Sequence, residues 1–175
     1  IGMATGSWAR VLAENPYVQE VVIVEINPGY YDLVKLYPES GALLTHPKVR
    51  IISDDARRWL NSTGEKFDFI VSNTSFHVRG FVSTLLSREF MELARAHLNP
   101  GGFLMFNTTG STRALGTAAA VFPHMSAYLR SAVCSNEPIV PDAKRYRDSI
   151  LAYRIDGKKV IDPEQPEHAK RLTLL

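Results

Sequence analysis

The stretch Val21-Val22-Ile23-Val24-Glu25 decides the fold class of this 175-residue chain. Four consecutive β-branched residues predict a strand that is buried on both faces, as strands of parallel sheets are. The run ends in a carboxylate, and Gly2 and Gly6 precede it by about one βαβ half-unit. Nucleotide-binding α/β folds hold ribose hydroxyls with an acid at such a strand end. The stretch therefore predicts a parallel α/β sheet and a cofactor that contains a nucleoside.

The rest of the chain alternates strands and helices. Apolar runs predict further strands at residues 49–52, 67–71 and 103–106, and helical spacing predicts helices at residues 8–15, 28–37, 56–60, 87–97 and 112–120. This order predicts a Rossmann-like, doubly wound α/β sheet that is mostly parallel.

The last third of the chain has a different pattern. Residues 127–133 and 149–155 alternate like an antiparallel strand pair, and Asp156-Gly157 favours a tight turn into a strand at residues 158–161. Residues 99–102 predict a turn, and Asp162-Pro163 predicts the start of a final helix.

The predicted order lacks its first strand. The chain opens with Ile1-Gly2, at what resembles the turn after a strand. We expect that this strand belongs to an upstream part of the natural protein. Residues 1–175 are then expected to form a single domain that is incomplete at its N-terminal end.

The composition argues against several function classes. The net charge is +2 and no Lys/Arg run exceeds two residues, which predicts no nucleic-acid partner and no anionic membrane surface. No stretch approaches the roughly 20 apolar residues of a membrane span. The lone cysteine, Cys134, fits a reducing compartment and predicts a cytoplasmic protein in which this thiol only packs. The histidines are scattered without ligand spacing, so no metal site is expected.

Three polar residues follow predicted strands: Glu25, Asp55 and Asn73. Ligands of open α/β sheets bind at these strand ends. Glu25 is expected to accept hydrogen bonds from ribose hydroxyls, and its alternatives are a helix cap or a surface ion pair. The Asp55 carboxylate and the Ala56 N–H are expected to hold an adenine edge; Asp55 can instead cap the following helix, and the two roles can coexist.

Two further segments are weaker candidates. Gly2 and Gly6 would let the backbone approach a cofactor, but their spacing differs from the dinucleotide fingerprint, which argues against a nicotinamide enzyme. The loop from Ser72 to Gly80 follows a strand and faces the predicted reacting group. Within it His77 is a candidate base and Arg79 a candidate holder of an acidic group, although lone loop histidines are usually surface residues.

Together these segments resemble the spermidine/spermine synthase family, a branch of the class I S-adenosylmethionine-dependent methyltransferase fold. The similar stretches are residues 15–28, 46–50, 54–56, 66–71, 85–90 and 98–102. The resemblance implies S-adenosylmethionine or its decarboxylated form as cofactor, with Glu25 on the ribose and Asp55 on the adenine. The cofactor-binding positions are then Gly2, Thr5, Gly6, Glu25, Ile26, Asp55, Ala56 and Asn73.

The chain departs from that family at two acids. The family's glycine-rich turn carries an Asp where Thr5 stands, and its Asp-Ser-Ser-Asp segment is here Asn73-Thr74-Ser75-Phe76, with Phe76 at the position of the base. A polyamine cation needs carboxylates in place of its hydration. Ordinary polyamine aminopropyl transfer is therefore not expected. The replacements favour a small-molecule substrate that is not a polycation, an anionic one included.

Two functions from different classes stay open. The first is a transferase that alkylates a small-molecule acceptor, with Asn73, His77 and Arg79 as catalytic residues and with either a methyl or an aminopropyl donor. The second is a non-catalytic nucleoside-binding or assembly module, which would bind adenosine-type ligands or form a homodimer without turnover.

Overall fold

The structure, a computed structural model, describes residues 1–73 and 82–173, and these fall into two units. Unit 1 consists of Ile1–Gly2, Val24–Asn27 and Ser53–Ile139. Unit 2 consists of Met3–Ile23, Pro28–Ile52 and Val140–Leu175. Each unit is described by itself.

Unit 1 is built on a four-stranded sheet with the order β3-β4-β6-β5. Its strands are β3 (Phe67–Ser72), β4 (Leu98–Asn107), β5 (His124–Tyr128) and β6 (Ser131–Ser135). Strands β3 and β4 run parallel, whereas β6 is antiparallel to both β4 and β5. The predicted combination of parallel strands with an antiparallel pair is therefore confirmed.

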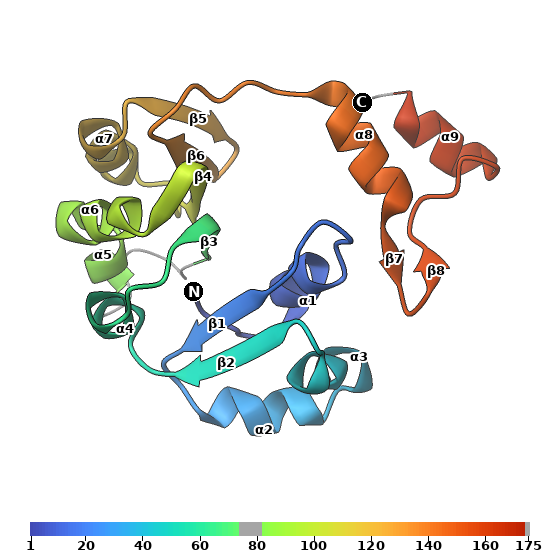
Figure 1. The fold of residues 1–175 in the computed structure, drawn as a ribbon, viewed down its shortest axis with the longest axis horizontal. Helices are drawn as coiled ribbons and strands as arrows, with labels where there is room; N and C mark the ends of the chain where they lie inside the picture. The colour runs from blue at the N-terminus through green and yellow to red at the C-terminus, as the bar shows by residue number, and fades with distance from the viewer. Residues whose placement is uncertain (74–81, 174–175) are drawn as a thin grey trace. The chain divides into compact units, whose positions relative to one another are not determined.

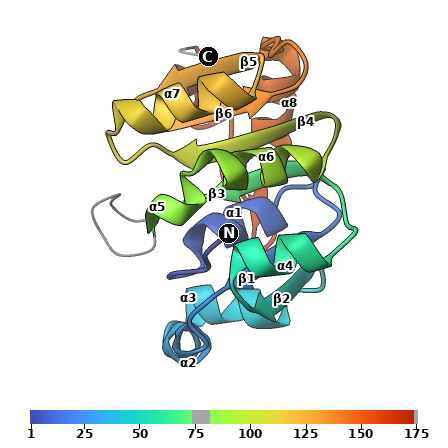
Figure 2. The same cartoon turned by 90° about the vertical axis from the view of Figure 1, so that its left-hand side faces the viewer.

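Helices α6 (Arg88–Ala96) and α7 (Thr112–Val121) lie together on one face of this sheet (Figures 1 and 2). The core beneath them holds Phe90, Leu104, Phe106 and Cys134, each at most 2% exposed. Helix α6 begins as its sequence predicts, because the Ser87 hydroxyl accepts a 3.2 Å hydrogen bond from the Phe90 N–H. The remaining helices of unit 1 are α4 (Ala56–Ser62) and α5 (Val82–Leu85).

Strands β1 (Val21–Glu25) and β2 (Val49–Ser53) form a separate two-stranded sheet, and their arrows point the same way in Figure 1. Both strands start in unit 2, and their last residues belong to unit 1. The unit 2 core contains Met3, Ala13, Ile23, Val34 and Leu43. Around it lie α1 (Ser7–Ala13), α2 (Gly29–Lys35), α3 (Pro38–Gly41) and the 3-10 helix η1 (Ala42–Thr45).

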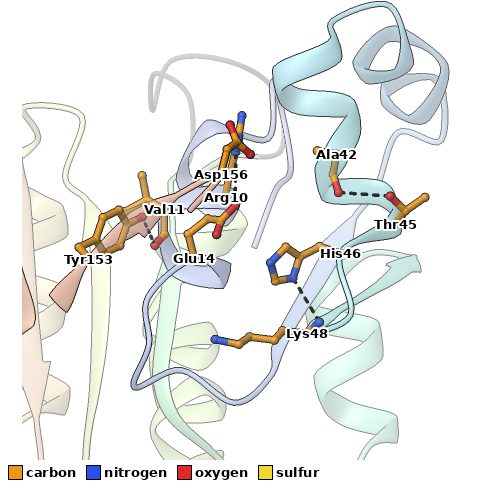
Figure 3. Close-up of polar contacts among 9 residues, drawn as sticks. All are labelled: Arg10, Val11, Glu14, Ala42, Thr45, His46, Lys48, Tyr153 and Asp156. Atoms are coloured by element: carbon orange, nitrogen blue, oxygen red, sulfur yellow. Dashed lines mark hydrogen bonds and ion pairs between the residues drawn. The ribbon is translucent and has the colours of Figure 1, made fainter. Parts of the chain in front are cut away.

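The C-terminal part of unit 2 comprises α8 (Ala143–Ala152), β7 (Arg154–Ile155), β8 (Lys158–Lys159) and α9 (Pro166–Leu172). Strands β7 and β8 form a hairpin that contacts α1 (Figure 3). The Asp156 carboxylate accepts two 2.8 Å hydrogen bonds from Arg10 Nη2. The Tyr153 hydroxyl donates a 2.6 Å hydrogen bond to the Val11 carbonyl. Hydrogen bonds between α1 and the C-terminal hairpin therefore connect the early and late segments of unit 2.

Ile1 and Gly2 connect two strands of unit 1. The Ile1 amine donates to the Val71 carbonyl of β3 at 2.6 Å, and the Gly2 N–H donates to the Val24 carbonyl of β1 at 2.9 Å. Both bonds are of the kind that joins neighbouring backbones in a sheet. The upstream first strand and the single-domain organisation stay predictions.

Several predicted elements of the last third were wrong. Residues 127–133 are not one strand but contain a tight turn, in which Leu129 has a φ of 54°, between β5 and β6. Residues 149–152 end helix α8, and only Arg154–Ile155 form a strand. The final helix starts at Pro166 rather than at residue 162, and the strand after Gly157 is limited to Lys158–Lys159. The turn at Asp156-Gly157 is confirmed, with φ values of 50° and 75°.

The predicted turn at residues 99–102 lies inside β4 and forms a bulge there, in which Gly101 has the left-handed φ of 72° that a tight turn requires. Phe67 pairs with Leu98, but Phe69 already pairs with Phe103, so β4 has extra residues opposite β3. Within the described part of the chain, no helix has the length and apolar character needed to cross a bilayer.

Candidate functional site

Polar residues at the strand ends of unit 1 form two neighbouring pairs, and each pair contains one predicted residue, Glu25 or Asn73. The Asp54 N–H donates a 3.1 Å hydrogen bond to the Glu25 carbonyl, which joins the end of β1 to the end of β2. Ser72 pairs with Phe106 in the parallel β3–β4 register, which sets Asn73 beside Asn107. Each pair lies at the carboxyl ends of its strands, where α/β sheets bind ligands.

Glu25 stands at the end of β1 and is 4% exposed. Its Oε1 accepts a 2.8 Å hydrogen bond from the Asn27 N–H. The carboxylate therefore supports the turn that leads into α2. Because the side chain is buried, a sugar can reach it only when the groups that cover it move.

Ile26 follows Glu25 and is 68% exposed. A single exposed isoleucine is common on protein surfaces, so this exposure alone does not indicate a binding site. Its position beside Glu25 and Asp54 gives this strand end an apolar surface next to polar groups. A purine nucleoside presents the same combination of an apolar ring and hydroxyls.

Asp55 is the N-cap of α4, and its Oδ1 accepts a 2.9 Å hydrogen bond from the Arg58 N–H. Capping, the alternative to an adenine role, is therefore confirmed, and it occupies only one of the two carboxylate oxygens. Asp54 is engaged separately, through Arg58 Nε at 2.6 Å and the Asp55 N–H at 2.6 Å. Within residues 1–73 and 82–173 the Ala56 N–H makes no hydrogen bond, as expected at the first turn of a helix. A carboxylate oxygen and an N–H donor therefore lie next to each other.

Asn73 is exposed at the end of β3, and its Oδ1 accepts a 3.3 Å hydrogen bond from Asn107 Nδ2. Asn107 ends β4, and its Oδ1 accepts a 2.8 Å hydrogen bond from the Thr109 N–H. The sequence analysis missed Asn107. The rule that selected Glu25, Asp55 and Asn73 would have found it, because it follows the apolar run at residues 103–106 directly.

The glycine turn is divided between the units. Gly2, in unit 1, has a φ of 80° and open space where a side chain would start. Gly6, in unit 2, has a φ of 81°, and an added Cβ would lie 3.0 Å from a Leu43 methyl group. Thr5, also in unit 2, shares a 2.9 Å hydrogen bond with the Ser7 hydroxyl. His77 and Arg79 lie outside the described residues.

Three of the described histidines, His46, His97 and His168, have hydrogen-bond partners in the backbone. Nδ1 of His46 accepts from the Lys48 N–H at 3.2 Å (Figure 3), and Nδ1 of His168 accepts from the Asp162 N–H at 3.0 Å. Nδ1 of His97 lies 2.7 Å from the Glu65 carbonyl. Over residues 1–73 and 82–173, no group of three or more His, Cys, Asp or Glu side chains is arranged to hold a metal ion.

The donor set of unit 1 fits an adenosyl group. Asp55 and Ala56 offer an acceptor and a donor side by side, Ile26 offers an apolar surface, and Gly2 leaves room for a close backbone approach. Glu25 fits in position and charge, but its burial means that it is not open to solvent in this structure.

Comparison with known proteins points to one family. The sequence model described as the spermine/spermidine synthase domain matches residues 1–144. Polyamine aminopropyltransferase 1 of Pseudomonas aeruginosa is 31% identical over 107 residues, which cover 60% of this chain and 37% of that protein. Polyamine aminopropyltransferase of Mycobacterium tuberculosis is 31% identical over 123 residues, covering 67% of this chain and 23% of that protein. The chain thus spans less than half the length of these relatives.

Solved structures show the same fold. A spermidine synthase in complex with the transition state analogue AdoDATO superimposes with a TM-score of 0.77 at 18% identity, covering 99% of this chain and 68% of that chain. Human methyltransferase-like protein 13 in complex with SAH gives a TM-score of 0.64 at 15% identity, covering 99% of this chain and 78% of that one. The expected Rossmann-like, methyltransferase-type fold is therefore confirmed.

Proposed function

The chain belongs to the spermine/spermidine synthase domain family, and from this we propose that it binds an adenosyl ligand at the strand ends of unit 1 and acts as a transferase. The observation that carries the proposal is the hydrogen bond between the Asp54 N–H and the Glu25 carbonyl. It sets an acid, an exposed apolar residue, and the donor and acceptor of Asp55-Ala56 at one edge. The relatives named polyamine aminopropyltransferase support a transferase of this kind.

Different residues of unit 1 would bind different parts of the adenosyl ligand. Glu25 would accept from the sugar hydroxyls, since an ionised carboxylate only accepts. Asp55 would accept from an amino group on the base and the Ala56 N–H would donate to a ring nitrogen, while Ile26 covers the ring. S-adenosylmethionine and its decarboxylated form supply, when bound, an electrophilic carbon on a positively charged sulfur.

Asn73, at the end of β3, would orient the tail of the ligand or the acceptor molecule. His77 and Arg79 keep their predicted roles, as proton acceptor and as holder of an acidic group. Rate acceleration would come mainly from positioning, which can contribute about 7–11 kcal/mol in well-oriented reactions. The acceptor we propose is a small molecule that is not a polycation, because Thr5 and Phe76 stand where the family carries acids.

The proposal is tested by calorimetric titration of the full-length protein with S-adenosylmethionine, its decarboxylated form, methylthioadenosine and NADH. We expect heat from the adenosyl ligands and none from NADH. Binding of the decarboxylated form alone would restore ordinary aminopropyl transfer. Silence toward every adenosyl ligand would overturn the proposal and favour the non-catalytic assembly module, which we would then expect as a homodimer.

A point variant tests the role of Glu25. Glu25→Gln keeps an oxygen for the Asn27 N–H but removes the charge, so the turn should persist while sugar binding weakens. Hydrogen bonds to charged groups are worth about 1.5–3 kcal/mol, which predicts roughly 10- to 100-fold weaker binding of methylthioadenosine. Glu92→Gln, an exposed acid of unit 1 that pairs with Arg88, is the matched control and should bind like the parent. Equal affinities of Glu25→Gln and the parent would refute the ribose assignment.

A further inference from the structure

We propose that Asn107 locks the side-chain amide of Asn73 so that a hydrogen-bond donor stands at the end of β3, and that this donor selects a ligand tail with an acceptor, such as a carboxylate. The inference rests on the proposed function, because Asn73 belongs to the same strand-end site. It adds a positioning residue and a specificity to that site.

The orientation of Asn107 follows from its partner in the backbone. An asparagine amide has an oxygen that accepts and a nitrogen that donates, and the two ends look alike in shape. The Thr109 N–H can only donate, and it lies 2.8 Å from Oδ1 of Asn107. This partner therefore determines which end of the amide is the oxygen. The nitrogen of Asn107 has to be the end that faces Asn73.

The orientation of Asn73 follows in turn. Asn107 Nδ2 lies 3.3 Å from Oδ1 of Asn73, so Asn73 accepts from Asn107. The remaining end of the Asn73 amide is its nitrogen, which is a donor. Asn73 is exposed, and no group of residues 1–73 and 82–173 accepts from this nitrogen, so we expect it to donate to a molecule that arrives at the end of the strand.

The turn that carries Thr109 is held in place by the turn between β5 and β6, where Arg130 lies. The N–H and hydroxyl of Thr108 both donate to the Arg130 carbonyl, at 2.7 and 3.1 Å, and Thr108 is 4% exposed. Thr109 has a φ of 54°, a left-handed conformation that is unfavourable for a β-branched residue and that persists only where its surroundings impose it. The Thr109 N–H is thus held in one place. Its position determines which ends of the Asn107 and Asn73 side-chain amides donate and which accept.

This polarity distinguishes the site from one lined by carboxylates. An ammonium group carries three donors and no acceptor, so the outward N–H of Asn73 repels it. A carboxylate accepts from the same N–H in a charge-assisted bond, which is about twice as strong as a neutral one. S-adenosylmethionine has a carboxylate on its tail, whereas the decarboxylated form lacks it. We therefore expect the parent protein to prefer S-adenosylmethionine.

The decisive variant is Asn107→Asp, which leaves Asn73 itself unchanged. A carboxylate still accepts from the Thr109 N–H but cannot donate to Asn73. The Asn73 amide then has to turn its nitrogen toward residue 107, and its oxygen becomes the outward end. We expect the ratio of the two dissociation constants, measured by calorimetry, to shift about 10-fold or more toward decarboxylated S-adenosylmethionine, the value of one charge-assisted bond.

The new negative charge alone would also favour a cationic tail, and a double variant separates the two effects. In the Asn73→Ala background the charge of Asn107→Asp is the same, but no amide is present to turn. We expect most of the 10-fold shift to disappear there. A shift of equal size in both backgrounds would show that charge acts without Asn73 and would overturn the inference.

The outcomes also separate this inference from the proposed function. If the parent binds both ligands and Asn107→Asp leaves their ratio unchanged, the relay from Thr109 through Asn107 is wrong while the adenosyl site stands. If the parent prefers the decarboxylated form, the donor assignment of Asn73 is wrong. If the parent binds neither ligand, the proposed function itself fails, and this inference fails with it.

Discussion

At the scale of single residues, Asp55 has a structural role that leaves one of its oxygens open for a predicted binding role. Its Oδ1 caps helix α4, and the neighbouring Ala56 N–H has no hydrogen-bond partner among the residues that the structure describes. From the sequence, capping and adenine binding were both expected as possible roles of Asp55 that can coexist. The structure confirms capping, and adenine binding stays a prediction that the second oxygen allows.

Substitutions that keep the cap can separate the two roles of Asp55. Asp55→Ala should lower the free energy of unfolding by about 1 kcal/mol, the usual cost of a lost N-cap. Asp55→Ser keeps a capping oxygen and should retain the stability of the parent, yet it removes the charged acceptor for an amino group. We therefore expect Asp55→Ser to bind methylthioadenosine about 10-fold more weakly. Urea denaturation and calorimetry measure the two effects, and parental affinity in Asp55→Ser would limit Asp55 to capping.

At the scale of elements, the bulge in β4 depends on Gly102. A Cβ at this position would lie 2.9 Å from the Asn99 carbonyl oxygen and 3.1 Å from those of Phe67 and Asp68. All three neighbours are backbone atoms, which cannot swing away. The bulge sets the β3–β4 register, and this register sets Asn73 beside Asn107.

Two glycine substitutions with opposite signs test this. We expect Gly102→Ala to destabilise the protein by about 1–3 kcal/mol, as overpacking does. The matched control is Gly116→Ala in the middle of α7, where nothing lies within 4 Å of the added Cβ. It should stabilise the protein by up to about 1 kcal/mol, because alanine favours helices over glycine. Chemical denaturation provides both values, and a neutral Gly102→Ala would show that the bulge tolerates a side chain.

Two elements show which secondary structure the sequence patterns predicted correctly and which they did not. The β-branched run that ends at Glu25 predicted β1 correctly, because its residue types and its short length both favour a strand. Helix α8 was mistaken for a strand because residues 149–155 alternate, and alternation over a few residues does not separate a strand from a helix end. A better signal was present. Asp142 caps this helix through the Arg145 N–H, and Lys144 pairs with Asp148 one turn later.

The partners of the strand-end residues were harder to predict. Position after a strand selected Glu25, Asp55 and Asn73, because that rule needs only local sequence. The bond between Asn73 and Asn107 joins residues 34 positions apart, and it depends on the β3–β4 register. That register includes the bulge at residues 99–102, where the sequence predicted the turn but not the strand that continues on both sides of it. The burial of Glu25 likewise depends on packing rather than on its place in the strand.

At the scale of the whole molecule, unit 2 is assembled from segments that lie far apart in the sequence. Tyr153 and Asp156 contact Val11 and Arg10, about 140 residues earlier (Figure 3). Burial raises the pKa of the Tyr153 hydroxyl above its ordinary value of 10.0, and the nearby Glu14 carboxylate raises this pKa further. Folding therefore favours the protonated phenol over its ionised form.

This predicts a stability loss in alkali. Because the folded pKa of Tyr153 lies above the unfolded one, its contribution is fully present below pH 10 and is lost as the pH rises through the folded value. Tyr153→Phe should reduce stability near neutral pH, since the bond to the Val11 carbonyl is lost, and should flatten the decline above pH 10. Tyr146 is 56% exposed, so Tyr146→Phe should keep the parental slope. The measurement is the free energy of unfolding of the parent and of both variants as a function of pH above 10. Equal pH slopes for all three proteins would contradict a raised pKa of Tyr153 as the cause of the decline.

The burial of the single cysteine has a practical consequence. Cys134 is wholly enclosed in the sheet of unit 1, and burial raises the pKa of its thiol to about 12, so it is neither accessible nor ionised under ordinary conditions. A maleimide or disulfide reagent can label it only in molecules whose sheet has transiently opened. Cys134 is the single cysteine of the chain. The labelling rate therefore reports how often the sheet of unit 1 opens, without a contribution from unit 2.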